Sequence, residues 1–325
     1  MKAVRIHSFG GPEVLQFEEL DKPEPSADEM LIRVHAAGVN PVDWKIREGL
    51  LKVRLPYIMG RDFSGVVEAL GPDVRDFRTG DSVFGQVARG SGSYAEYAIA
   101  PVSQVASKPA ALDHIHAAAL PIASLTAWQA LFDTADLKAG QKVLIHAAAG
   151  GVGSFAVQFA KWKRAYAVGT ASAHNVDFVR HLGADEVIDY RAAKIEEIVC
   201  DADVVLDTIG GDTQDRSWEI LKPNGILVSV VQPPPQEKAK AHGARGVFLI
   251  SKARGDQLTE IADLVASSQV KVTVETILPL REARKAQELS QSRHTRGKIV
   301  LVVDFRAAQW TANPGPNSSS WYLPL

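Results

Sequence analysis

Three small residues between Val143 and Ala156 have the spacing of a phosphate-binding turn. Gly151, Gly153 and Ala156 fit the pattern G-x-G-x-x-G/A, in which the first glycine makes a tight turn and the second lets backbone approach a pyrophosphate. The third small residue lets the following helix pack on the preceding strand, and the N–H groups at the start of that helix attract phosphates. The motif therefore predicts dinucleotide binding, with an ordinary glycine-rich loop as the alternative.

The position about 20 residues beyond these glycines decides which dinucleotide fits, because an acidic side chain there binds the ribose 2′-hydroxyl and repels a 2′-phosphate. In this chain the position is occupied by residues 169–172, GTAS, which contain no carboxylate. The hydroxyls of Thr170 and Ser172 can donate to a phosphate, which favours NADP over NAD. The alternative is that both hydroxyls cap a helix expected over residues 173–182, since serine is a favoured N-cap residue.

The elements that must position this motif alternate between strands and helices. A strand at 143–146 precedes the glycines, and apolar side chains between Phe155 and Trp162 have helical spacing. Further short apolar strands are expected at 166–168, 186–189, 204–207 and 226–231, with helical segments at 195–199 and 214–221. This alternation predicts an α/β fold with a doubly wound parallel sheet.

The first hundred or so residues have a different pattern, in which apolar and polar side chains alternate as they do in half-buried strands. Segments of this kind lie at 2–7, 30–36, 66–69, 82–87 and 94–99. They predict a small, mostly β, barrel-like domain. Helices expected at 117–120 and 124–133 lead from this domain into the glycine motif.

The C-terminal part is expected to contain helices at 255–267 and 280–292 and strands at 270–277 and 298–304. The last residues, 305–325, have no hydrophobic period and are rich in Pro, Ser and Asn. They are predicted to be a disordered or artificially appended tail outside the fold.

Composition excludes several classes of protein. An apolar share of 46%, a charged share of 23% and a net charge of -2 are those of an ordinary water-soluble globular protein and give no footprint for nucleic acid. No segment resembles a signal peptide or a membrane span, so we expect a cytoplasmic protein without nucleic-acid or membrane partners. The single cysteine, Cys200, excludes an intrachain disulfide or a zinc site built from cysteines, and we expect its thiol to be buried.

Further landmarks resemble those of the zinc-free quinone oxidoreductase and alkenal reductase branch of the medium-chain dehydrogenase/reductase superfamily. In chain order they are VNPVDWK at 39–45, GRDFSG at 60–65, GDSV at 80–83, AAAGGVG at 147–153, GTAS at 169–172, LGAD at 182–185 and GKIVL at 297–301. The resemblance implies a GroES-like catalytic domain over residues 1–120, completed by 266–304, and a Rossmann dinucleotide-binding domain over 121–265. It also implies a homodimer.

The resemblance implies chemistry without zinc. Zinc-dependent alcohol dehydrogenases of the superfamily have a cysteine near the position of Asn40 and a histidine at that of Arg61. An amide is a poor zinc ligand and a guanidinium cannot be one. Without a Lewis acid, the expected substrate is already electrophilic: a quinone, an enal or an enone, which accepts hydride at carbon while negative charge moves to oxygen.

Asn40 and Lys45 are the candidate catalytic residues, because the resembling family places this turn beside the nicotinamide and the substrate. Lys45 is expected to donate to the cofactor or the developing enolate, and its alternative is a solvated lysine. Asn40 can instead cap the turn. Asp62 can form an ion pair with Arg61 or Lys45, a role that competes with a catalytic one.

The resemblance also implies the cofactor contacts, position by position. They are Thr126 near the nicotinamide ribose, Gly150, Gly151, Val152 and Gly153 at the pyrophosphate, and Thr170, Ser172, Tyr190 and Arg293 at the 2′-phosphate. Many NADPH-using members have a lysine where this chain has Asn175, so Arg293 is the expected cation, with His174 nearby.

The sequence thus predicts an NADPH-dependent, zinc-independent reductase of quinones or activated alkenes. Two alternatives stay open at this point. One is a thioester enoyl reductase, for which Lys238, Lys240 and Arg245 would form the basic surface that a carrier phosphate needs. The other is a dinucleotide-binding structural or regulatory protein with little catalysis, since fold does not determine function.

Overall fold

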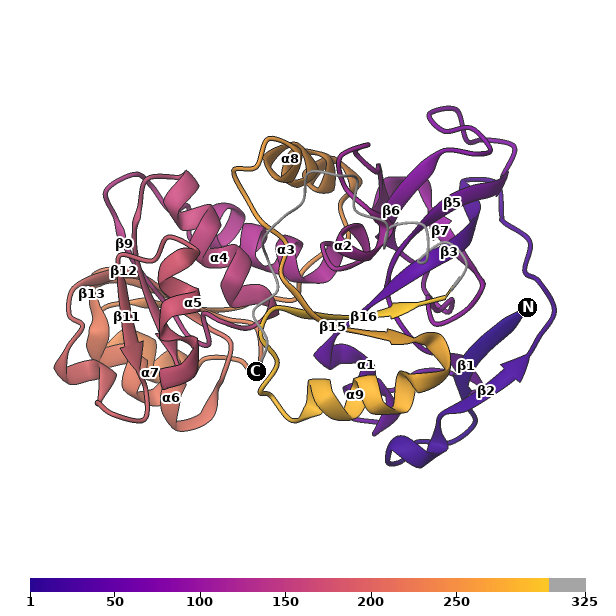
Figure 1. Cartoon of the computed structure of the whole chain (residues 1–325). Helices are drawn as coiled ribbons and strands as arrows, with labels where there is room; N and C mark the ends of the chain where they lie inside the picture. The colour runs from indigo at the N-terminus through magenta and orange to yellow at the C-terminus, as the bar shows by residue number, and fades with distance from the viewer. Residues whose placement is uncertain (304–325) are drawn as a thin grey trace.

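The structure, a computed structural model, describes residues 1–303, and the tail predicted at 305–325 lies outside the described residues. One lobe contains a six-stranded parallel sheet, and the other contains a seven-stranded sheet with a three-stranded sheet beside it (Figure 1). The predicted α/β class, with a doubly wound sheet next to a mostly β N-terminal domain, is confirmed.

The N-terminal lobe is built from eight strands and two helices. They are β1 (Lys2–Ile6), β2 (Gln16–Glu19), β3 (Glu29–Val39), α1 (Pro41–Arg47), β4 (Tyr57–Ile58), β5 (Asp62–Leu70), β6 (Ser82–Gln86), β7 (Tyr97–Pro101), β8 (Val105–Ser107) and α2 (His114–Ala118). β3 pairs antiparallel with both β5 and β7. The sequence did not predict β2, β4 or β8, because these strands are short and β2 in particular has no fully buried side chain.

The second lobe follows a βαβ order. Its elements are α3 (Pro121–Trp128), β9 (Lys142–Ile145), α4 (Gly151–Trp162), β10 (Tyr166–Ala171), α5 (Val176–His181), β11 (Glu186–Asp189), β12 (Ala202–Asp207), α6 (Gly211–Ser217), β13 (Leu221–Ser229), α7 (Gln236–Ala241) and β14 (Arg245–Phe248). The strand order β11-β10-β9-β12-β13-β14 reverses direction between β9 and β12. Ligands of such sheets bind at the carboxyl ends of the strands at this reversal, which is where the glycine motif lies.

Several local predictions differ from the structure. The helix expected at 124–133 ends as α3 at Trp128 and continues as a π-helical turn. The helix expected at 173–182 is a 3-10 turn followed by α5, and Ser172 makes no side-chain capping bond there. Cys200 is exposed rather than buried, because it lies in the loop before β12.

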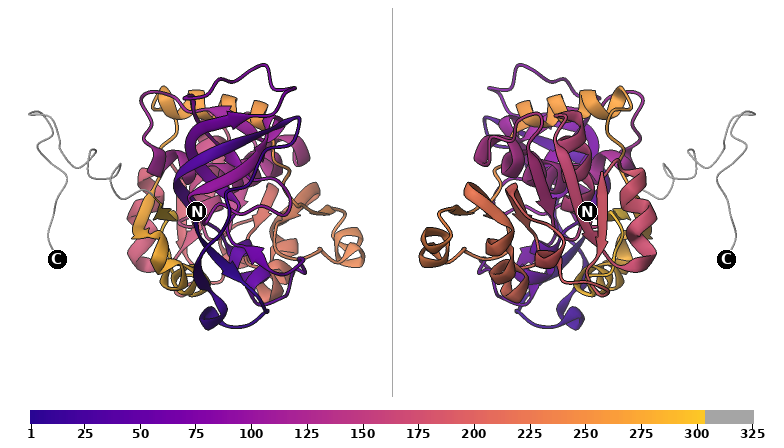
Figure 2. Two further views of the ribbon diagram at one scale, coloured as in Figure 1. Left: turned by 90° about the vertical axis from the view of Figure 1, so that its right-hand side faces the viewer. Right: turned by 90° about the vertical axis from the view of Figure 1, so that its left-hand side faces the viewer.

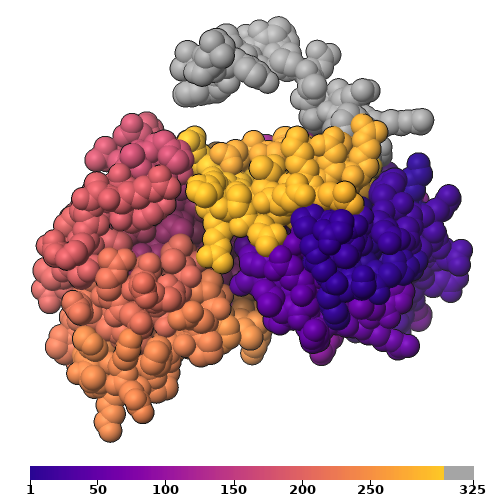
Figure 3. Space-filling view, turned by 90° about the horizontal axis from the view of Figure 1, so that it is seen from below, coloured from indigo at the N-terminus to yellow at the C-terminus, as the bar shows by residue number. Residues whose placement is uncertain are grey.

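The C-terminal elements return to the N-terminal lobe. They are α8 (Gly255–Ala266), β15 (Val274–Pro279), α9 (Ala283–Gln291) and β16 (Lys298–Val302). β16 pairs antiparallel with β3 and parallel with β15, so the end of the described chain joins the seven-stranded sheet to which β3 belongs. Figures 1 and 2 place α8 and α9 on opposite sides of the molecule, and Figure 3 shows the last part of the described chain, in yellow, lying between the two lobes. No helix in the described part of the chain is long and apolar enough to cross a membrane.

Candidate active site

The glycine turn connects the end of β9 to the first turn of α4. Gly150 N donates to the Ala147 carbonyl at 2.9 Å, and a Cβ on Gly153 would lie 2.3 Å from that oxygen, so only glycine fits at Gly153. A Cβ on Gly150 would meet only the same carbonyl, at 3.3 Å, so the turn is open to a ligand on this side. Gly150 is the N-cap of α4 and has no side chain to cap it, which leaves first-turn N–H groups for an anion. A pyrophosphate fits this turn.

Gly151 faces the C-terminal strand. A Cβ on Gly151 would lie 3.0 Å from Cδ of Lys298 and 3.4 Å from the carbonyl oxygen of Gly297. Gly297 N donates to the Ala149 carbonyl at 2.8 Å. The glycine turn is therefore built against β16 as well as against its own sheet, a contact that no local motif reveals.

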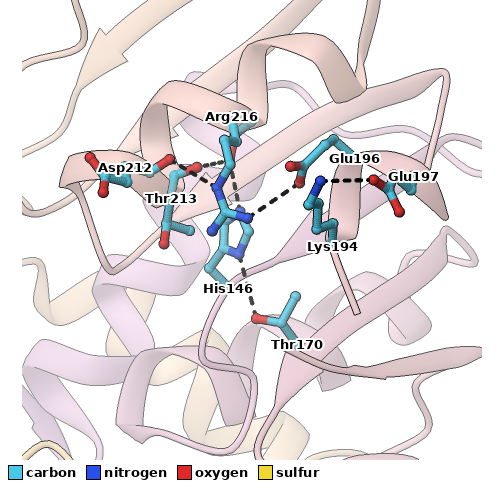
Figure 4. Close-up of polar contacts among 9 residues, drawn as sticks. His146, Thr170, Lys194, Glu196, Glu197, Asp212, Thr213 and Arg216 are labelled. Carbon is cyan, nitrogen blue, oxygen red and sulfur yellow. Dashed lines mark hydrogen bonds and ion pairs between the residues drawn. The ribbon is translucent and has the colours of Figure 1, made fainter. Parts of the chain in front are cut away.

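Thr170 lies beneath the turn rather than on its open side. It is 3% exposed, and its Oγ1 accepts from Ala147 N at 3.1 Å and lies 3.4 Å from Nδ1 of His146. Burial lowers the pKa of His146 to about 4, so this ring is neutral at physiological pH. His146 lies between Thr170 and Arg216, whose guanidinium pairs with Glu196 at 3.5 Å (Figure 4). The Thr170 hydroxyl is thus used to hold the turn.

A cluster of polar side chains follows the end of β10, where the adenosine ribose of a dinucleotide binds. Asn175 Nδ2 lies 3.4 Å from Ser172 Oγ and 3.3 Å from His174 Nε2. Asn175 Oδ1 accepts from Nε of Arg296 at 3.0 Å, and the guanidinium lies 5.1 Å from the ring centroid of Phe178. Sequence reasoning missed Arg296; its position directly before the Gly297 landmark was the available signal.

Tyr190 and Arg293 make different contacts. Tyr190 follows β11, the parallel neighbour of β10, and its N–H donates to the Ala171 carbonyl at 3.2 Å, which places it at the same edge. Its side chain is 48% exposed and available to a ligand. Arg293, in contrast, follows α9 with a positive φ of 61°, and its charge acts on Lys45.

Thr126 and Val152 are the remaining predicted cofactor contacts. Thr126 lies on α3, is 6% exposed and donates from Oγ1 to Ser251 Oγ at 2.9 Å, which joins α3 to the segment after β14. Val152 is half-buried in the first turn of α4 and packs against the main apolar core. Its backbone is therefore what it presents to a pyrophosphate.

Asn40 begins α1 and is 2% exposed. Its Nδ2 donates to Asp62 Oδ2 at 2.8 Å, and its Oδ1 accepts from Nζ of Lys298. Lys298 Nζ also donates to the Val39 carbonyl at 2.8 Å. The sequence predicted an ion pair of Asp62 with Arg61 or Lys45. Instead, the Asn40 amide lies between Asp62 and Lys298 and is hydrogen-bonded to both.

Two buried carboxyl groups accept hydrogen bonds from Asn40, one from its backbone N–H and one from its side chain. Asp43 accepts from Asn40 N at 2.8 Å and from the Tyr94 hydroxyl at 2.9 Å, and Asp62 also accepts from Ile122 N at 3.1 Å. Burial raises the pKa of Asp43 to about 7 and that of Asp62 to about 6. Burial likewise lowers the pKa of Lys298. The pKa values of the two carboxyl groups and of the lysine are thus all shifted in the direction that favours the neutral form, as expected of charged groups removed from water.

Lys45 projects from the same helix and is half-buried. Burial, followed by the charge of Arg293, lowers the pKa of its ammonium group. The ammonium lies 5.8 Å from the ring centroid of Trp44. A lysine with a lowered pKa is a stronger acid at neutral pH and hence a better proton donor.

Within residues 1–303 no group of three or more His, Cys, Asp or Glu side chains is arranged to hold a metal ion. His114 and His116 point to different partners. Nδ1 of His114 lies 2.8 Å from Ser64 Oγ, whereas Nδ1 of His116 lies 2.8 Å from Asp113 Oδ1. Both histidines therefore serve local packing and hydrogen bonding.

The chain is similar to known dehydrogenases and quinone oxidoreductases in both sequence and structure. Residues 26–110 match the family model of the alcohol dehydrogenase GroES-like domain, and residues 182–301 match that of the zinc-binding dehydrogenases. The chain is 36% identical over 323 residues to a quinone oxidoreductase of Sus scrofa, an alignment that covers 93% of this chain and 98% of that protein. It is 35% identical over 319 residues to a chloroplastic NADPH-dependent alkenal/one oxidoreductase of Arabidopsis thaliana, covering 93% and 79%. The solved structure of Escherichia coli quinone oxidoreductase complexed with NADPH superposes with a TM-score of 0.87 at 31% identity, covering 93% of this chain and 100% of that one.

Proposed function

Because this chain belongs to the quinone oxidoreductase branch of the medium-chain dehydrogenase/reductase superfamily, we propose that it reduces quinones or α,β-unsaturated carbonyls with NADPH and without a metal. The observation that carries the metal-free chemistry is the environment of Asn40. Zinc-dependent relatives have a cysteine ligand near this position, whereas here the ammonium of Lys298 is bonded to Asn40 Oδ1. A buried cation in contact with this amide repels Zn²⁺, and the Asn40 Nδ2 is already donating to Asp62.

Lys45 is the residue that we assign to the substrate. When bound, NADPH supplies a hydride to a carbon of the substrate, and negative charge then develops on the carbonyl oxygen. The ammonium of Lys45 can stabilise this charge and deliver a proton, which its lowered pKa favours. Asn40 acts on this step indirectly, because it begins the helix that carries Lys45 and its own amide is engaged inside the protein.

The cofactor contacts follow the open edge of the parallel sheet. We assign the pyrophosphate to the N–H groups of Gly150, Gly151, Val152 and Gly153, and the nicotinamide ribose to Thr126. We assign the 2′-phosphate to Ser172, Tyr190 and Arg296. Arg296 replaces Arg293 as the expected cation because it is held at the end of β10 by Asn175.

The remaining assignments concern organisation. We propose that residues 1–120 with 266–304 form the catalytic domain and that residues 121–265 form the cofactor domain. We also propose a cytoplasmic homodimer, which is supported by the low cysteine content and by β14 standing at the edge of its sheet, where a second copy can pair.

A substrate screen tests this function. Purified protein is assayed with a set of quinones, enals and enones, each with NADPH and with NADH, before and after treatment with a chelator. We expect turnover of at least one electrophile, preference for NADPH and no loss of activity with the chelator. Activity that the chelator abolishes and added zinc restores would contradict the metal-free mechanism.

A further inference from the structure

Lys298 is a buried charge that has no contact with substrate or cofactor in the proposed reaction. It is 4% exposed and begins β16. A buried ammonium is unfavourable unless an anion opposes it and its hydrogen bonds are made. Asp62 is the opposing anion and accepts from the other end of the Asn40 amide at 2.8 Å, and Nζ makes two hydrogen bonds, to Asn40 Oδ1 and to the Val39 carbonyl. An apolar side chain would fill this space without burying a charge, so the charge itself calls for an explanation.

Three elements of the candidate active site meet at this one side chain. Asn40 is the N-cap of α1, which carries Lys45. Asp62 accepts from Ile122 N at 3.1 Å, in the first turn of α3, which carries Thr126. The aliphatic part of Lys298 lies against Gly151 in the glycine turn, where an added Cβ would be 3.0 Å from Cδ. The side chain therefore joins the substrate side of the site to the cofactor side.

We propose that Lys298 is a positioning residue, which fixes the Lys45 helix, the Thr126 helix and the glycine turn relative to one another. This inference rests on the proposed function, since it assigns these three elements to one reaction. Its physical basis is charge: without the ammonium, the Asp62 carboxylate has no cation bonded to its amide partner. The other charged or titratable groups that act on Asp62 are Arg61, Asp43 and Tyr94.

Replacing Lys298 by methionine removes the charge and keeps most of the apolar side chain. We expect kcat with the best quinone or enone to fall by about 10- to 100-fold, the size of effect produced by a small misplacement of reacting groups. We also expect a new pH dependence of NADPH affinity, measured by fluorescence titration. Because the charge of Lys298 lowers the pKa of Asp62, this pKa rises when the cation is lost, and NADPH affinity should fall by about tenfold as the pH rises through the ionisation of this carboxyl.

The matched control is Lys285→Met, which removes an exposed lysine on α9 and should leave kcat and the pH profile unchanged. The double variant Lys298→Met/Asp62→Asn removes both charges and provides a folded form if the single variant does not fold. In this double variant kcat should stay low, because Asn40 Oδ1 still lacks the Lys298 ammonium as its donor. The pH dependence of NADPH affinity should disappear, because the titrating carboxyl of Asp62 is gone.

Wild-type kcat in either Lys298 variant would overturn the proposal. So would reduced thermal stability together with unchanged kcat and a flat pH profile, which would assign Lys298 to the fold alone. Absence of quinone and enone turnover in the wild-type protein would instead refute the proposed function, while the NADPH titrations would still report whether Lys298 positions the glycine turn.

Discussion

The guanidinium of Arg296 gives the most direct test of cofactor choice. Its Nε donates to Asn175 Oδ1 at 3.0 Å, and the group lies 5.1 Å from the ring centroid of Phe178, so its plane is fixed at the end of β10. Within the described residues the hydrogen bonds of Arg296 use its backbone N–H and its Nε, and neither Nη1 nor Nη2 takes part in a hydrogen bond or ion pair. These N–H groups are therefore available to a 2′-phosphate, in the paired geometry that arginine offers to phosphates.

The expected magnitude follows from this geometry. A hydrogen bond to a charged group contributes about 1.5 to 3 kcal/mol, and each 1.4 kcal/mol is roughly tenfold in affinity. Arg296 is half-exposed, so screening by salt places the effect near the lower end of this range. Arg296→Ala should therefore weaken NADPH binding by about 10- to 30-fold. NADH has no 2′-phosphate, and its binding should change little.

The assay is a fluorescence titration of the wild-type protein, Arg296→Ala and Arg293→Ala with NADPH and NADH, supported by calorimetry with 2′,5′-ADP and 5′-ADP. Arg293→Ala is the matched control, because it removes a nearby exposed arginine that acts on Lys45 instead. An equal loss for both cofactors in Arg296→Ala would show that this arginine serves the fold. A selective loss in Arg293→Ala alone would restore the assignment made from the sequence.

Three further predictions test other parts of the site. Gly153→Ala should weaken binding of both cofactors, because its Cβ would lie 2.3 Å from the Ala147 carbonyl; unchanged titrations in a folded variant would contradict the turn geometry. Lys45→Met should lower kcat more than it raises KM for NADPH, and a pure KM effect in steady-state kinetics would remove its role as proton donor. Because burial raises the pKa of Asp43 to about 7, wild-type protein should lose stability relative to Asp43→Asn as the pH rises from about 4 to about 7, by up to about 4 kcal/mol. Urea unfolding at several pH values measures this difference, and parallel pH profiles would show that Asp43 is not buried as described.

The features that depend on sequence neighbours could be predicted. The glycine spacing, the strands on either side of it and the lack of a carboxylate at residues 169–172 are all local. The burial of Thr170 could not be predicted in this way, because it depends on β10 continuing to Ala171 and on the side chain pointing towards His146.

The contacts that complete the site join distant parts of the chain. Arg296 and Asn175 are separated by 121 positions, and Lys298 and Asn40 by 258. Nothing in either local sequence indicates its partner. These pairs form only because β16 returns to lie beside β3, a consequence of sheet order that no motif in the chain encodes.

The return of β16 also affects how this protein is made. Residues Ala36–Val39 of β3 pair with Val302–Ile299 of β16, so the ribosome completes one strand of this pair long before the other. At about 5 to 20 residues per second, the interval is on the order of tens of seconds. During that time residues 36–39 of β3 expose the N–H and C=O groups that later pair with β16, and another chain can pair with them and aggregate. We therefore expect the newly synthesised N-terminal sheet to be prone to aggregation, and deleting β16 should give a chain that aggregates through β3 although its parallel sheet has all six strands.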